Sequence, residues 1–235
     1  MNGRRRFGPG VPPIDSAPEL GSGALPRTAL PVQGGLPRHL EAHLHRLEAG
    51  AAAMGEAVGW LPSMQEPLTD WLEATTGSGE AALRLILDPR AGILTAQLEP
   101  LPAVPRPCRL IPMRHPLEAR LGDPTTGHKG LSGPWGKATL AEAQRKGGDD
   151  ALLLWRDGTL AETAIATVGI EAEGVLTLPL RQGRVASLTE RLDLPDWAHA
   201  RGLRIEVKAV SLPSARAGVI WCMNALRGIW SATLL

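Results

Sequence analysis

The chain has 235 residues, of which 43% are hydrophobic and 21% are charged, so it can bury a sizeable core and is not a disordered tail. Its 25 Lys and Arg residues balance 24 Asp and Glu residues, and a net charge of +1 excludes the strong attraction that nucleic acids and acidic membranes use. The two cysteines lack metal-ligand spacing, and no apolar stretch is long enough to span a bilayer. We therefore expect a soluble cytoplasmic protein with no metal site, no nucleic-acid partner and no membrane partner.

The N-terminal segment is rich in proline and glycine up to residue 36, which predicts a mobile arm with short edge strands. We expect poor order before residue 24. From residue 37 to 54 the apolar side chains recur every three or four residues, at Leu40, Leu44, Leu47, Ala51 and Met54. This spacing predicts an amphipathic helix, and a second, weaker helix is expected over 64–74.

Three short apolar runs follow, over residues 81–87, 92–98 and 108–112, and each is bounded by proline, glycine or aspartate. Runs of this length and composition are typical of strands. The first two runs are separated by a short turn segment, which predicts a hairpin. The segment 116–128 carries further prolines and glycines and is the most natural domain boundary.

The second half of the chain consists mostly of predicted strands. A helix is expected near 136–146, followed by strands over 151–155 and 159–171. The Asp157-Gly158 pair between these two strands is a strong hairpin signal. The remaining predicted elements are a strand at 175–179, a helix near 195–201, a strand at 203–209, and a final helix and strand.

Two titratable residues in this half suggest chemistry. Lys129 is one of only four lysines and lies at the end of a loop, and Glu162 lies 33 residues later in an otherwise apolar strand. A buried carboxylate is costly unless a cationic partner compensates it.

Seven short motifs surround these two residues, at 43–47, 128–130, 148–154, 157–163, 174–179, 183–191 and 224–229. Their order along residues 36–231 resembles the fold-type IV pyridoxal-phosphate enzymes, the class IV aminotransferase family. That family includes branched-chain and D-amino-acid transaminases and aminodeoxychorismate lyase. The resemblance implies pyridoxal 5′-phosphate as the cofactor.

The resemblance assigns roles to five residues. Lys129 matches the Schiff-base lysine, and Glu162 matches the acid that pairs with the pyridinium nitrogen. Arg46 matches a phosphate ligand, one helical turn after His43, and Leu188 and Thr189 match a loop that binds phosphate through backbone amides and a hydroxyl. Other interpretations stay open: a surface lysine, an edge-strand acid facing water, a solvated helix face and an ordinary helix N-terminus.

Two further arginines are candidates for gripping a substrate carboxylate, Arg84 in a strand and Arg114 beside His115. The alternative for each is an ordinary salt bridge. The chain also departs from the family pattern. It has no tyrosine, and Trp135 falls near the position of the family's cofactor-binding tyrosine; Ser187 replaces a glycine in the phosphate loop, Thr167 replaces an asparagine, and Ala225 replaces a serine or threonine.

The resemblance implies an α/β fold with a small N-terminal α/β domain and a larger C-terminal α/β domain with a mostly β core. The expected ranges are 1–24 for the arm, 25–118 for the N-terminal domain, 119–127 for a linker and 128–235 for the cofactor-binding domain. Because the family builds its sites close to a second subunit, the resemblance also implies a homodimer.

The segment Asn224-Ala225-Leu226 and the short chain look most like aminodeoxychorismate lyases. This favours a lyase of folate biosynthesis, which converts 4-amino-4-deoxychorismate to 4-aminobenzoate and pyruvate. The first alternative is an amino-acid transaminase for branched-chain or D-amino acids. The second is a non-catalytic scaffold of the same fold, suggested by the missing tyrosine and the altered phosphate loop.

Overall fold

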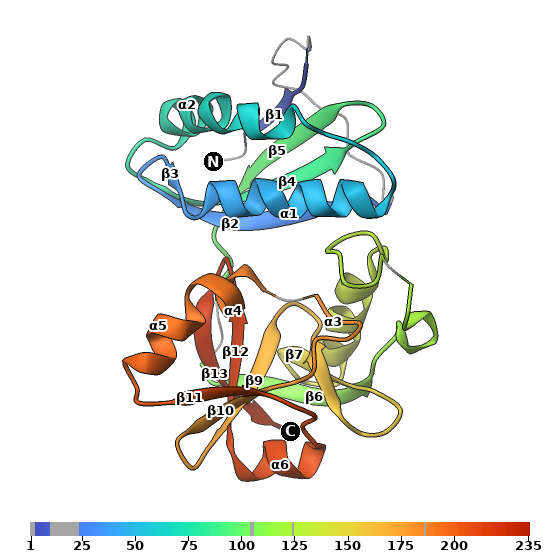
Figure 1. Cartoon of the computed structure of the whole chain (residues 1–235). Coiled ribbons are helices and arrows are strands. Elements are labelled where there is room, and N and C mark those ends of the chain that lie inside the picture. Colours follow the sequence, from blue (N-terminus) through green and yellow to red (C-terminus); the bar gives the residue numbers. More distant parts are fainter. Residues whose placement is uncertain (1–2, 10–23, 104–105, 124, 186) are drawn as a thin grey trace. The chain divides into compact units, whose positions relative to one another are not determined.

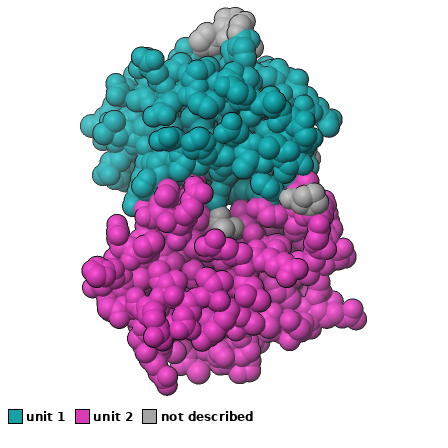
Figure 2. Space-filling model, viewed as in Figure 1, with its two compact units in different colours: residues 1–102, 128–133 teal, residues 103–127, 134–235 magenta. Residues whose placement is uncertain are grey.

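The structure is a computed structural model that describes residues 3–9, 24–103, 106–123, 125–185 and 187–235. It divides into two compact units, shown in Figure 2: residues 1–102 with 128–133 form unit 1, and residues 103–127 with 134–235 form unit 2. Each unit contains helices packed on a β-sheet. The predicted α/β fold class is therefore confirmed.

The two units differ from the predicted domains in two segments. Strand β6 (Cys108–Arg114), expected in the N-terminal domain, pairs in parallel with β7 (Asp150–Leu154) and therefore belongs to unit 2. Residues 128–133, expected in the C-terminal domain, belong to unit 1, where the backbone N–H of Arg27 donates to the carbonyl of Lys129 at 3.0 Å. Both segments are placed by long-range backbone pairing, which the local sequence pattern does not contain.

The predicted arm is also corrected in one place. Residues Arg4–Phe7 form strand β1, which pairs antiparallel with β5 (Ile93–Glu99) at the edge of the sheet. Phe7 explains why this segment is ordered, because its ring is buried and lies edge-on against Trp71 with ring centroids 6.0 Å apart. The rest of the predicted arm, residues 1–2 and 10–23, lies outside the described residues.

The sheet of unit 1 is antiparallel, and its strand order is β1-β5-β4-β2-β3. Its remaining strands are β4 (Glu80–Asp88), β2 (Arg27–Gln33) and β3 (Leu36–Pro37). The predicted hairpin is confirmed, since β4 and β5 pair directly with Asp88 opposite Ile93.

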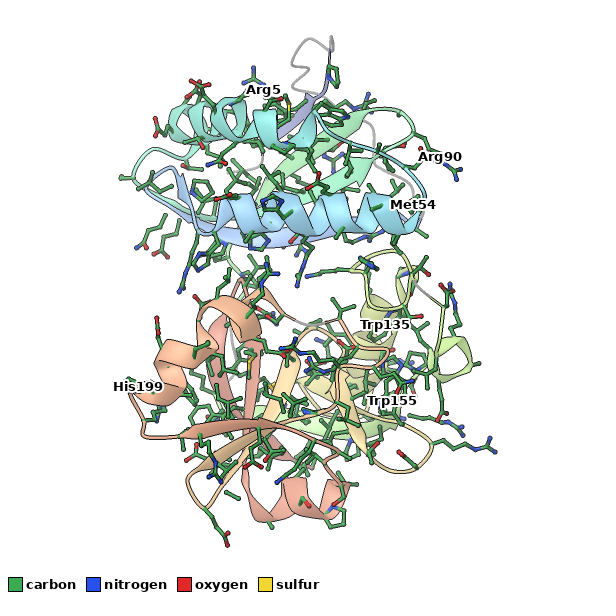
Figure 3. The ribbon with its side chains drawn as sticks, in the orientation of Figure 1. Arg5, Met54, Arg90, Trp135, Trp155 and His199 are labelled. Atoms are coloured by element: carbon green, nitrogen blue, oxygen red, sulfur yellow. The ribbon has the colours of Figure 1, made fainter. Side chains whose placement is uncertain are left out.

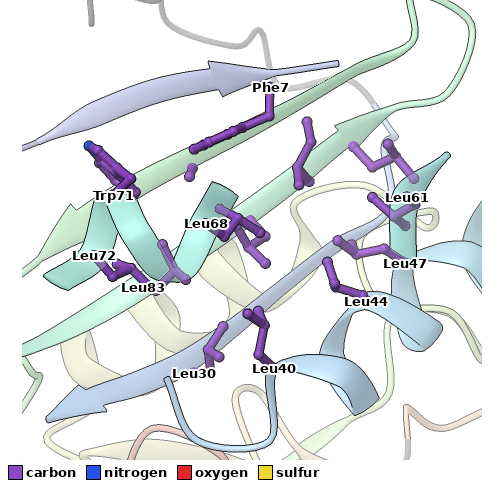
Figure 4. Close-up of a cluster of buried hydrophobic side chains, with 14 of the residues drawn as sticks. Phe7, Leu30, Leu40, Leu44, Leu47, Leu61, Leu68, Trp71, Leu72 and Leu83 are labelled. Carbon is purple, nitrogen blue, oxygen red and sulfur yellow. The ribbon is translucent and has the colours of Figure 1, made fainter. Parts of the chain in front are cut away.

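Two helices and a short 3-10 helix bury the apolar side chains of this sheet. They are α1 (Leu40–Ala53), η1 (Leu61–Met64) and α2 (Gln65–Thr76), which confirms both predicted helices. Figure 4 shows Leu44 and Leu47 of α1 and Leu68 of α2 directed into one core with sheet residues. Each such leucine contributes roughly 1.5–3 kcal/mol by leaving water. Figure 1 shows α1 lying along β2, the strand from which Arg27 projects.

Unit 2 is built on an eight-stranded mixed sheet in the order β11-β10-β9-β12-β13-β6-β7-β8. Three neighbouring pairs are parallel: β10 with β11, β13 with β6, and β6 with β7. The remaining strands are β8 (Leu160–Thr163), β9 (Thr167–Ala172), β10 (Val175–Leu178), β11 (Arg204–Val207), β12 (Val219–Asn224) and β13 (Gly228–Leu234).

Two details of this sheet differ from the prediction. The single strand expected over 159–171 is divided into β8 and β9, because the side chain of Thr163 accepts a hydrogen bond from the backbone of Ala166 at 2.8 Å and closes a turn. The expected final strand is a hairpin of β12 and β13. The helices of unit 2 are η2 (Glu118–Arg120), α3 (Trp135–Arg145), α4 (Leu188–Leu192), α5 (Leu194–His199) and α6 (Leu212–Ala217).

Candidate active site

Glu162 lies on β8, which is an edge strand, yet its side chain is buried. This corrects the interpretation of Glu162 as an edge-strand acid facing water. Its Oε1 accepts hydrogen bonds from His115 Nε2 at 3.4 Å and from the backbone N–H of Val185 at 3.3 Å, and among the described residues no donor reaches Oε2. Burial raises the pKa of the Glu162 carboxyl, and the hydrogen bond from His115 opposes that shift only in part.

His115, which follows β6, is held between two tryptophans. Its ring stacks on Trp155 with centroids 4.2 Å apart and an interplanar angle of 30°, and it lies 5.1 Å from the ring of Trp135. Figure 3 labels both tryptophans in unit 2. Trp135, the residue nearest to the position of the family's tyrosine, therefore packs on the partner of Glu162. Sequence reasoning missed the role of His115, since 47 residues separate it from Glu162.

The loop that carries Val185 is fixed by a buried ion pair. The guanidinium of Arg184 donates to both carboxylate oxygens of Glu190, at 2.7 and 3.1 Å, and to the carbonyls of Pro179 and Leu180 at 3.1 and 3.2 Å. Both charged side chains are almost fully buried. These contacts tie Arg184 to α4, which carries Glu190, and to the two residues that follow β10.

The same loop leads into α4, whose N-cap is Ser187. The backbone N–H of Ser187 donates to Thr167 Oγ1 at 3.1 Å, and Ser187 Oγ accepts from the backbone N–H of Thr189 at 3.1 Å. Ser187 has φ −66° and ψ 145°, so this position does not require the glycine that is usual in the family. The hydroxyl of Thr189 is buried and has no hydrogen-bond partner among the described residues. Leu188, which precedes Thr189 and is the first residue of α4, is also buried.

Lys129 lies in unit 1, in the short segment that returns to β2. Its side chain is half-buried. Its carbonyl accepts from the backbone of Arg27, and the next residue, Gly130, has φ +98° and contacts the Arg27 side chain. Burial lowers the pKa of the Arg27 guanidinium. Sequence reasoning missed Arg27, because only the backbone pairing shows that it lies beside Lys129.

A substitution at Gly130 tests how the segment 128–133 holds Lys129. A Cβ at this position would collide with the carbonyl of Leu25 and lie 2.6 Å from Arg27 Nε, in addition to the strain of a positive φ. We expect Gly130→Ala to lower the free energy of unfolding by more than the ~1–2 kcal/mol of backbone strain alone. Gly133→Ala is the matched control, since Gly133 has φ +82° and nothing within 4 Å of its Cβ position. Urea denaturation of the two variants measures the difference, and equal losses would contradict the predicted collision.

Arg46 lies on α1, half-buried, one turn after His43. His43 is buried, and its Nδ1 lies 2.6 Å from Thr28 Oγ1, so this histidine fixes α1 on β2. The geometry supports a structural role for His43. The role of Arg46 as a phosphate ligand stays a prediction.

The two candidate substrate arginines make the ion pairs that the sequence also allowed. Arg84 pairs with Glu99 across the β4–β5 hairpin, and Arg114 pairs with Glu118 at 2.6 Å. All four groups lie at least partly in solvent, where such pairs contribute little to stability. Neither arginine enters the site that we propose.

Comparison with known proteins identifies the family. The sequence model of the family described as amino-transferase class IV matches residues 28–235. The chain belongs to this family. The class IV protein is therefore a pyridoxal-phosphate-dependent enzyme, either a lyase or a transaminase, and the resemblance stated from the sequence is confirmed. No curated protein matches its sequence.

Solved structures show the same fold. A fold IV transaminase from Curtobacterium pusillum has a TM-score of 0.80 and 21% identity, and the match covers 100% of this chain and 92% of that one. A hypothetical aminotransferase from Mycobacterium tuberculosis, in its PLP-bound form, has a TM-score of 0.83 and 21% identity, with 98% and 90% covered. For a 4-amino-4-deoxychorismate lyase from Pseudomonas aeruginosa the TM-score is 0.72 and the identity 21%, with 98% and 91% covered.

The residues of unit 2 fit the cofactor of the class IV enzymes. Pyridoxal phosphate needs an acceptor for its ring N–H and donors for its phosphate. Glu162 offers a buried carboxylate with Oε2 left open, and Thr189 offers a buried hydroxyl whose hydrogen-bonding capacity is unused among the described residues. An unused buried hydroxyl is unfavourable unless a ligand satisfies it. These two groups are therefore the ones we assign to the ring nitrogen and the phosphate.

Among the described residues, no helix is both long and apolar enough to cross a membrane. The predicted homodimer and the predicted cytoplasmic location stay predictions.

Proposed function

We propose that this class IV enzyme is a lyase that converts 4-amino-4-deoxychorismate to 4-aminobenzoate and pyruvate, a reaction of folate biosynthesis. The observation that carries the choice is the turn after β12. Asn224 uses its amide within the protein, donating to the carbonyl of Ile165 at 3.1 Å and accepting from the backbone of Arg227 at 3.0 Å. Ala225, the next residue, has no hydroxyl to offer where transaminases of the family often have serine or threonine.

This lack of a hydroxyl matters more to a transaminase than to a lyase. A transaminase must hold its cofactor without a covalent link between its two half-reactions, so it depends more strongly on non-covalent contacts such as those to the phosphate. A lyase restores the link to its lysine at the end of every turnover. The absence of a hydroxyl at residue 225 therefore supports the lyase.

The residues of the chain have separate tasks in this reaction. When bound, the cofactor supplies a sink for the electron pair that remains after a proton leaves the substrate. Glu162 would hold the ring nitrogen, and Arg46, Leu188 and Thr189 would hold the phosphate. Arg27, whose backbone bonds to that of Lys129, would place a guanidinium near one of the substrate's two carboxylates.

Lys129 would carry the proton transfer. Lys129 Nζ would act as the base that removes the proton from the ring carbon bearing the amino group of the substrate. The ether C–O bond to the enolpyruvyl group then breaks, and the ring becomes aromatic. The enolpyruvyl group takes up a proton and leaves as pyruvate, so the products are formed in equal amounts.

The test supplies the purified protein with 4-amino-4-deoxychorismate and measures both products. We expect pyruvate and 4-aminobenzoate in a 1:1 ratio, and borohydride reduction followed by peptide mapping should find the pyridoxyl label on Lys129. Lys129→Ala should abolish both results, while the matched control Lys137→Ala, an exposed lysine of α3, should change neither.

The transaminase is the other outcome of this test. It is favoured by the higher TM-scores of the structures described as aminotransferases, 0.80 and 0.83 against 0.72 for the Pseudomonas aeruginosa lyase. Leucine, D-alanine and glutamate are therefore given singly, without any keto acid acceptor. Release of one keto acid per site would overturn the lyase. If no keto acid is released from these amino acids, and 4-amino-4-deoxychorismate yields 4-aminobenzoate and pyruvate, the lyase is supported.

A further inference from the structure

The hydrogen bonds of His115 identify which ring nitrogen carries its proton. Nδ1 accepts from the backbone N–H of Leu117 at 3.1 Å, so in the neutral ring the proton lies on Nε2. Nε2 is the atom that lies 3.4 Å from Glu162 Oε1. Nε2 is therefore the ring atom that donates to Glu162.

The position of the His115 ring is fixed by its surroundings. Its side chain has no exposure to water, and Nδ1 accepts from the backbone N–H of Leu117. The ring also cannot turn away easily, because Trp155 stacks on it and the backbone N–H of His115 donates to Leu154 at 2.8 Å. Packing and hydrogen bonding thus fix the orientation of this ring.

The neighbouring arginine does not close an ion pair with Glu162. Arg184 acts on Glu162 electrostatically, but its guanidinium donates to both carboxylate oxygens of Glu190. Its charge is therefore largely neutralised within its own pair. Oε1 of Glu162 is anchored by His115 Nε2 and the backbone N–H of Val185, while Oε2 meets no donor among the described residues.

We propose that His115 is a positioning residue that aims the carboxylate of Glu162 at the ring nitrogen of the cofactor. Donors on Oε1 suit this task, because they fix the carboxylate and leave Oε2 for the ring N–H. The proposal rests on the cofactor dependence of the family and not on the choice between lyase and transaminase.

The test measures cofactor affinity in the cofactor-free protein, by quenching of tryptophan fluorescence on titration with pyridoxal phosphate. His115→Phe keeps an aromatic ring between Trp135 and Trp155 but removes the donor. We expect the dissociation constant to rise roughly 10–100-fold, the range for losing one hydrogen bond to a charged group. His115→Gln, which restores an N–H donor, should recover part of the affinity, and the exposed control His199→Phe should leave it unchanged.

A second measurement reads the ring directly. Nitrogen-15 NMR of the cofactor-free wild type should show a proton on Nε2 of His115. A ring without a proton on Nε2, or a His115→Phe variant that binds the cofactor as tightly as the wild type, would overturn the proposal. Wild-type protein that binds the cofactor but forms neither 4-aminobenzoate nor pyruvate would overturn only the lyase, whereas wild-type protein that binds no cofactor would overturn both.

Discussion

Replacing Glu162 by glutamine should lower turnover by roughly 10²–10³-fold, the loss typical of deleting one preorganised electrostatic group. The amide keeps the size and the hydrogen-bonding length of the side chain but removes the negative charge that holds a proton on the ring nitrogen. The cofactor would still be held by its phosphate and by Lys129, so we expect the loss mainly in kcat. Steady-state kinetics of the cofactor-saturated variant measures it.

The same substitution has an opposite effect on the stability of the cofactor-free protein. Burial raises the pKa of Glu162 in the folded state, so the folded protein holds this proton more tightly than the unfolded chain does. The stability that this proton provides is complete below the unfolded pKa of about 4.3 and is lost as pH rises through the raised folded pKa. Glutamine is uncharged and does not titrate. The Glu162→Gln variant should therefore be at least as stable as the wild type at neutral pH.

These two measurements separate catalysis from folding. If the variant were unfolded, its loss of activity could not be attributed to the missing charge. We expect a variant that is well folded and has the lower turnover. Glu171→Gln is the control, because Glu171 lies on β9, the next strand along the chain, and its carboxylate accepts from the indole N–H of Trp221 at 2.7 Å. Full activity in Glu162→Gln would remove this residue from the mechanism.

The sequence was sufficient to predict the elements that follow a strong local pattern. The leucines at 40, 44 and 47 have helical spacing, and they do form the buried face of α1. Glu162 was recognisable because an acid in an apolar strand is costly, and the structure places it in a buried position. What local patterns cannot provide is the identity of the partners, which in the structure are His115 and the backbone N–H of Val185.

The same limit applies to the parts of the site that the sequence did not predict. Arg27 lies beside Lys129 only because the chain, after passing through residues 103–127 of unit 2, returns to β2 about a hundred residues after Arg27. The loop before α4 was matched through Leu188 and Thr189, yet its conformation depends on Arg184 and Glu190, a buried pair that no periodicity predicts. Such contacts follow from tertiary packing, which overrides local propensity.

Breaking the buried ion pair of Arg184 and Glu190 gives the largest expected effect on stability. Arg184→Met should lower the free energy of unfolding by roughly 3–5 kcal/mol, the range for removing one partner of a buried ion pair. The loss is large because Glu190 would keep a buried negative charge without its bidentate partner, and the carbonyls of Pro179 and Leu180 would lose their donor. Urea denaturation of the cofactor-free protein measures the change.

Two further variants show whether the uncompensated charge is the cause. Arg181→Met is the matched control, because Arg181 also lies near Glu190, at 3.6 Å, but is mostly exposed and should cost less than about 1 kcal/mol. Combining Arg184→Met with Glu190→Leu removes both charges together, so the double variant should recover much of the stability lost in Arg184→Met alone. If the double variant is instead less stable than Arg184→Met, the loop depends on the hydrogen bonds of the pair and not on its charge balance, and the explanation given for the large loss is wrong.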